Sequence, residues 1–89
     1  MGGVTMTFKN KLACSTLTDN QHHSIIQNIE YFFSVVDTID ELEYECKRLS
    51  TFVWSLETMS FICPCEREKY LVFIKEKYEE SFERIKKRS

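Results

Sequence analysis

The sequence predicts an all-α protein: a small antiparallel three-helix bundle preceded by a flexible N-terminal arm. The 89-residue chain contains only two Gly and one Pro, which argues against turn-rich all-β architectures. Apolar residues recur three and four positions apart over three long segments, as on one face of an α-helix. We expect helices over about 18–36, 38–62 and 64–87. A chain of this length forms one domain, so residues 1–17 are assigned to the arm and residues 18–89 to a single helical domain.

The first predicted helix begins near Thr18. Thr18 and Gln21 match a capping box, and Leu17 is placed as the hydrophobic staple just outside it. The apolar stripe that follows consists of Ile25, Ile26, Ile29, Phe32, Phe33 and Val36. His22 falls within this stripe at its N-terminal end. In the preceding arm, apolar and polar residues alternate over residues 4–9. Because no partner strand is evident, we expect a loosely docked segment there rather than a strand.

The second predicted helix begins with another capping box, Thr38 to Glu41, and is expected to be the longest. Its heptad pattern is typical of a coiled coil and consists of Ile39, Leu42, Cys46, Leu49, Val53 and Leu56, continued by Ser60 and Cys63. The helical phases of the first and second stripes differ by roughly 120°. One continuous rod would therefore present its two halves to different neighbours, so we expect a break at 36–38. At its heptad position Cys46 is expected to pack as a small apolar residue.

The third predicted helix opens at Pro64, with Cys63 as its N-cap. Its buried stripe consists of Leu71, Ile74, Tyr78, Phe82 and Ile85. Arg84 is expected to pair with Glu80 on the solvent face. Short connections make neighbouring helices antiparallel. The alternative architecture is a hairpin of the second and third helices that dimerises, with the first helix packed across it.

Four apolar residues lie outside the expected core faces: Trp54, Phe61, Val72 and Phe73. A middle helix contacts two neighbours, which accounts for the pair on the second helix. An outer helix buries one face only, so the pair on the third helix indicates a second contact surface. Exposed apolar patches usually mark protein interfaces. We therefore expect these residues to bind a partner protein or a second copy in a homodimer, with the protein acting as a regulator, adaptor or inhibitor.

A second hypothesis concerns cysteine and histidine. Antiparallel packing brings the start of the first helix, the end of the second and the start of the third to one end of the bundle. Cys14, His22, Cys63 and Cys65 would converge there, and thiolate and imidazole are the ligands that zinc prefers. The alternatives are a redox thiol pair, or turn and core residues with no cofactor. Either a zinc site or a thiol pair would make the protein a sensor.

Other function classes have less support. The net charge of -2 argues against a dedicated nucleic-acid binder, although the basic turn at 84–88 leaves a weak accessory role open. Gly-rich phosphate loops, nucleophile elbows and HExxH motifs are missing, so we do not expect an enzyme. The sequence shows neither a secretory signal nor an apolar run of membrane-spanning length. We accordingly expect a cytoplasmic protein with reduced thiols.

Overall fold

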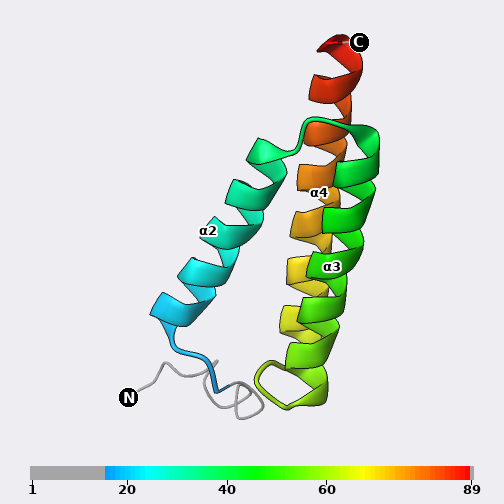
Figure 1. Ribbon diagram of the computed structural model, residues 1–89. Helices are drawn as coiled ribbons and strands as arrows, with labels where there is room; N and C mark the ends of the chain where they lie inside the picture. Colours follow the sequence, from blue (N-terminus) through cyan, green and yellow to red (C-terminus); the bar gives the residue numbers. More distant parts are fainter. Residues whose placement is uncertain (1–15, 89) are drawn as a thin grey trace.

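The computed structural model describes residues 16–88 and shows three helices: α2 (Asp19–Val35), α3 (Ile39–Thr58) and α4 (Pro64–Arg88). No strand occurs among these residues. The chain runs along α2, returns along α3 and reverses again along α4 (Figure 1). The prediction of a small antiparallel three-helix bundle is confirmed. Most of the predicted arm, residues 1–15, lies outside the described part of the chain.

The first helix starts as its capping residues predict. The Thr18 hydroxyl oxygen accepts the Gln21 backbone N–H at 3.1 Å, and the Gln21 side-chain oxygen accepts the Thr18 N–H at 2.8 Å. This reciprocal pair is a complete capping box, which satisfies two backbone donors at the helix start. Leu17, just before it, is partly buried against the core. The chain therefore enters α2 in a fixed direction.

The predicted break between the first two helices is confirmed at residues 36–38. Val36 (φ -74°, ψ 141°) and Thr38 (φ -127°, ψ 159°) are extended. The Thr38 hydroxyl caps α3 by accepting the Glu41 N–H at 3.1 Å. The Glu41 carboxylate, however, accepts the Asp37 N–H at 2.8 Å rather than that of Thr38. Only half of the second capping box therefore forms, and the other half fixes the connecting turn.

The carboxyl end of α2 is capped by α4. The last turn of α2 has no basic residue of its own. Arg84 donates from Nη2 to the carbonyls of Phe33 at 3.1 Å and Val36 at 2.7 Å, and the Ser81 hydroxyl donates to the Phe33 carbonyl at 3.2 Å. These bonds satisfy carbonyls that a helix end otherwise leaves without partners. The predicted pair of Arg84 with Glu80 is wrong, because the guanidinium is directed to α2 instead.

The second helix ends earlier than predicted, at Thr58 instead of residue 62. Ser60 adopts a left-handed backbone with φ 65°. Its N–H donates to the Glu57 carbonyl at 2.9 Å, and the Phe61 N–H donates to the Leu56 carbonyl at 2.8 Å. This pair of bonds is a Schellman motif, which reverses the chain after a helix. The apolar register extends past this point, so the spacing of apolar residues alone cannot locate the end of the helix.

As a result, the predicted order of helix lengths is wrong: α4 has 25 residues and α3 has 20. Cys63 leaves the α3 heptad and serves as the N-cap of α4, as expected, with its carbonyl accepting the Arg67 N–H at 2.9 Å. Its own N–H donates to the Glu66 carboxylate at 3.3 Å. The turn from α3 to α4 is thus defined by backbone bonds on both sides.

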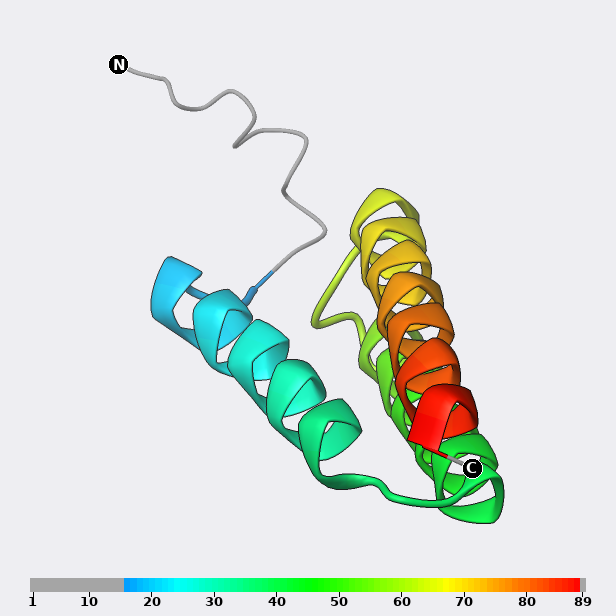
Figure 2. The same ribbon diagram turned by 90° about the horizontal axis from the view of Figure 1, so that it is seen from above.

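The core lies where the three helices meet. Its most deeply buried side chains are Ile29, Phe33, Leu42, Val53, Ile62 and Ile74. Cys46 is partly buried and packs against this cluster, consistent with its predicted role. The helices α3 and α4 form an antiparallel hairpin, and α2 leans against it, diverging from the hairpin toward its own N-terminus (Figures 1 and 2). The helices α3 and α4 therefore pack more closely against each other than α2 packs against either of them.

Ser60 gives a direct test of the α3 end. A non-glycine residue in the left-handed region is strained, so Ser60→Gly should raise the free energy of unfolding by about 0.5–1 kcal/mol in urea denaturation. The matched control is Ser24→Gly, an exposed serine inside α2, which should lower it by about 0.5 kcal/mol because Gly is a poor helix former. Destabilisation by both substitutions would contradict the assigned turn.

Candidate partner-binding surface

Large apolar side chains are exposed unevenly over the three helices. Six lie on α3 or in the loop after it, two on α2 and one on α4. They are Ile39, Tyr44, Phe52, Trp54, Met59 and Phe61, then Tyr31 and Val35, and finally Val72. The sequence predicted a contact surface built from the second and third helices. In the structure, α4 contributes one exposed residue to it, and α2 contributes two.

Three of the four predicted partner-binding residues are exposed. Trp54 is 48% exposed, Phe61 40% and Val72 52%. Phe73 is partly buried against the core, and the Lys77 ammonium lies 5.5 Å from its ring centre. The expectation that Phe73 lies on the outer face of α4 is wrong. This helix packs against both α2 and α3 and therefore buries a wider face than an outer helix with one neighbour.

Trp54 is held in place by a cation. The Arg67 guanidinium carbon lies 4.3 Å from the centre of the indole ring. The same guanidinium bonds the carboxylates of Glu57 at 2.7 Å and Glu68 at 2.9 Å. Arg67 thus covers one face of the indole while salt bridges fix its own position. The indole of Trp54 is thus covered by Arg67 on one face, and 48% of the residue remains exposed.

The seam between α2 and α3 contains two hollows. The first, of about 450 Å³, lies beside the α2–α3 turn, and we call it the acidic hollow; it is lined by Val35, Val36, Asp40, Glu41, Tyr44 and Glu45. The second, of about 340 Å³, lies at the opposite ends of the two helices, and we call it the apolar hollow; it is lined by Leu17, Asn20, Gln21, Ser24, Ile25, Phe52 and Leu56. The seam is therefore open at both ends.

Between the hollows the seam is bridged by Arg48. Its guanidinium carbon lies 4.5 Å from the centre of the Phe32 ring, and its Nη2 lies 2.6 Å from the Glu45 carboxylate. Tyr44, Arg48 and Phe52 are spaced four residues apart, so they follow one another along the same side of α3. The acidic hollow, the Arg48 bridge and the apolar hollow together form one continuous strip, which we call the α2/α3 seam.

Sequence reasoning placed none of the four predicted partner-binding residues in this seam, although it assigned the acidic start of the second helix, which lines the acidic hollow, to steering the encounter with a partner. Phe52 is 43% exposed, Val35 50% and Tyr44 64%. A signal was present for Phe52, since it widens the apolar stripe of α3 on one side. Val35 and Tyr44 lie off every apolar stripe, and only the fold, which turns the chain between them at residues 36–38, shows that they line the same hollow.

The predicted zinc ligands are only partly described. Cys14 lies outside residues 16–88. Cys63 is buried and Cys65 is exposed, both with free thiols. His22 and Cys63 do lie at one end of the bundle, because the Glu66 carboxylate is 3.4 Å from His22 Nε2 and accepts the Cys63 N–H. Over residues 16–88, no group of three or more Cys, His, Asp or Glu side chains is arranged to hold a metal. Zinc binding stays a prediction.

His22 joins the start of α2 to α4. Its Nδ1 hydrogen-bonds the Tyr70 hydroxyl, its ring stacks on that of Tyr70, and its Nε2 faces Glu66. Both ring nitrogens therefore have protein partners. A hollow of about 270 Å³ adjoins this contact and is lined by His22, Ile26, Glu66, Lys69 and Tyr70. The contact tethers α2 to α4 at the end opposite to Arg84.

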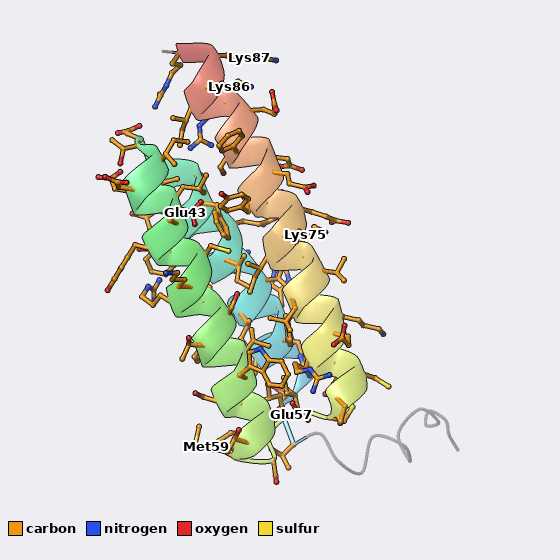
Figure 3. All side chains as sticks on the ribbon, turned by 90° about the vertical axis from the view of Figure 1, so that its right-hand side faces the viewer. Glu43, Glu57, Met59, Lys75, Lys86 and Lys87 are labelled. Carbon is orange, nitrogen blue, oxygen red and sulfur yellow. The ribbon has the colours of Figure 1, made fainter. Side chains whose placement is uncertain are left out.

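Four basic residues lie at the end of α4, and two of them, Arg84 and Arg88, bind other parts of the protein. Arg84 caps α2, and the Arg88 guanidinium bonds the Asp37 carboxylate at 2.8 Å. Lys86 and Lys87 are exposed at the far end of the molecule from Met59 (Figure 3). The weak nucleic-acid role expected from this turn would depend mainly on these two lysines, and it stays a prediction.

Comparison with known proteins gives no further guide to function: no protein-family model, curated protein or solved structure matches the chain. The helices described here contain no stretch with the length and apolar character needed to cross a membrane.

Tyr70 provides a pH-dependent test of the contact with His22. Burial, together with the negative charge of Glu66, raises the pKa of the Tyr70 hydroxyl to about 12 from its ordinary value of 10.0. Between these values the unfolded chain has lost this proton and the folded chain has kept it. The free energy of unfolding should therefore fall as the pH rises from 10 to 12, by about 2 kcal/mol for this group.

The measurement is denaturant unfolding at pH 9 and at pH 12 for the wild type and for Tyr70→Phe. The variant should start less stable, because His22 loses its partner, but it should lose less stability with rising pH. An identical loss in the two proteins would show that Tyr70 ionises equally in the folded and unfolded chains.

Proposed function

We propose that the protein is a small protein-binding module that acts as a regulator, adaptor or inhibitor by docking an apolar and aromatic helical surface on a partner. The observation that carries this proposal is the open α2/α3 seam. It exposes Val35, Tyr44 and Phe52 around two hollows, although the same helices bury a core between them. Apolar surface left exposed and concave usually marks an interaction site.

The composition of the surface supports this proposal. Aromatic residues dominate the binding energy of interfaces, and Tyr44, Phe52 and Trp54 are all exposed on α3. The Arg67 guanidinium lies over one face of Trp54, and this cation–π contact favours the orientation in which the indole is presented. We propose that the seam is the main contact. Trp54 lies beside Arg67 of α4, on another side of α3 from Phe52, and would form a second, separate contact with the predicted residue Phe61.

The proposal includes a cytoplasmic location and a binding rather than a catalytic role. Cys46, Cys63 and Cys65 are free thiols, a state that persists where the environment is reducing. Within residues 16–88 the polar clusters near the seam serve the fold: Arg48 with Glu45 bridges the helices, and Glu41 fixes the turn. These contacts give the surface its shape and leave its apolar residues available.

Site-specific photo-crosslinking tests the proposal. A photoreactive phenylalanine analogue is introduced separately at Phe52, Tyr44 and Val72, and each protein is irradiated in extract of its source cells. We expect covalent adducts from the first two positions and few or none from the third. Val72 was predicted from the sequence to bind the partner, but it lies on α4 and lines neither hollow, so the proposed seam does not include it. Circular dichroism of each protein checks that all three are folded.

The mass of an adduct identifies the class of partner. An adduct of twice the 10.6 kDa chain mass would show that a second copy occupies the seam, and any other mass would show a different protein. Absence of adducts at both seam positions, or equal adducts at Val72, would contradict the proposed function.

A further inference from the structure

We propose that the α2/α3 seam binds one amphipathic helix of a partner protein, and that this helix carries basic residues at the end that lies over the acidic hollow. This inference rests on the proposed function and specifies its partner. It is based on the spacing of the two hollows, on the elements that line them and on their charge.

The seam is suited to a helix rather than to an extended strand. It is a groove between two helices, and the side-chain ridge of a third helix fits such a groove. Strand addition needs an exposed sheet edge, and no strand occurs in residues 16–88. A docked helix would lie over the Arg48 bridge, with side chains in the two hollows, and would complete a four-helix arrangement.

The distance between the hollows sets the spacing of the partner's anchoring residues. Tyr44 and Phe52 line different hollows and are eight residues apart on α3, which corresponds to roughly 12 Å of helix. On α2, Val35 and Ile25 are ten residues apart, or roughly 15 Å. Apolar side chains two to three turns apart on a partner helix, such as at positions i and i+7 or i+11, would reach both hollows.

The charge of the seam selects a basic partner. Three carboxylates line the acidic hollow, those of Asp40, Glu41 and Glu45, and neither hollow is lined by a cation. The nearby cation, Arg48, is already paired with Glu45 and stacked on Phe32. Since Arg48 neutralises Glu45, the uncompensated negative charge of this hollow is that of Asp40 and Glu41. Lys or Arg on one end of the docked helix would complement these two carboxylates and accelerate encounter.

The same charges argue against a second copy as the occupant. A two-fold dimer brings the same patch of each subunit together. Each copy would then offer carboxylates and neutral polar residues to the other, with Arg48 already neutralised. No lysine of the described residues lines either hollow, so a second copy would bring no cation from its own hollows to these carboxylates. A basic helix of a different protein would therefore complement the charge of the seam better than a second copy would.

Selection from a phage-displayed library of random amphipathic 20-residue helices, with the full-length protein immobilised, tests this inference. The selected peptides should carry a net positive charge and apolar residues at the spacing given above. Their affinities are then measured by fluorescence titration. Phe52→Asp and Tyr44→Asp should each weaken binding by tenfold or more, because a charge replaces an apolar contact.

Two further variants separate the seam from the rest of the surface. Val72→Asp changes an equally exposed apolar residue on α4 and should leave the affinity unchanged. Asp40→Lys should lower the affinity for basic peptides by about threefold to tenfold and reduce the salt dependence of binding. All four substituted residues are exposed, so the variants should remain folded, which circular dichroism confirms.

The inference is overturned if no peptide is enriched, if the enriched peptides are acidic or neutral, or if Val72→Asp weakens binding as much as Phe52→Asp. Crosslinking at Phe52 without enrichment of basic peptides would leave the proposed function standing and remove only this partner class. If adducts and enriched peptides are both missing, both proposals fail.

Discussion

Arg84 connects the carboxyl end of α2 to α4, and the arrangement of the three helices depends on this contact. The guanidinium bonds the carbonyls of Phe33 and Val36 at the point where the chain leaves α2. Without a basic residue in its last turn, α2 has no local means of satisfying these groups. The contact also attaches the carboxyl end of α2 to α4. The turn at 36–38 then leads the chain from this point to α3.

The second anchor lies at the other end of α2, where His22 contacts Tyr70 and Glu66. Both anchors therefore attach α2 to α4, whereas within residues 16–88 the contact of α2 with α3 includes the Arg48 guanidinium over the Phe32 ring. The α2/α3 seam has hollows at both of its ends, whereas the hollow between α2 and α4 lies beside the His22 contact. The candidate binding surface thus follows from the attachment of α2 to α4, which leaves apolar residues exposed along α3.

Much of the fold could be predicted from local sequence signals. Thr18 and Thr38 carry hydroxyls that cap the next helix, and the change of helical phase between the stripes located the turn at 36–38. Pro64 and its preceding cap located the start of α4. These features depend on residues close together in the chain, so the sequence contains them directly.

The features that the sequence could not show depend on long-range geometry. Ser60 ends α3 in a left-handed conformation that usually selects Gly or Asn, and the apolar register continues past it. Arg84 has an acidic residue four positions before it, and only the fold reveals that the α2 carbonyls are nearer. For the surface, Val72 could be predicted as exposed, whereas Trp54 was equally consistent with burial against a second neighbour of the middle helix. Phe73 could not be placed without knowing that α4 packs against two helices.

Native-state hydrogen exchange on Arg84→Met is the measurement that tests this account most directly. If Arg84 holds α2 on α4, the amides of α2 should lose protection selectively in the variant. The amides of the α3–α4 hairpin should then retain most of theirs, apart from a uniform global change. Equal loss of protection in all three helices, or unchanged protection in α2, would contradict the claim that this contact positions the helix and keeps the seam open.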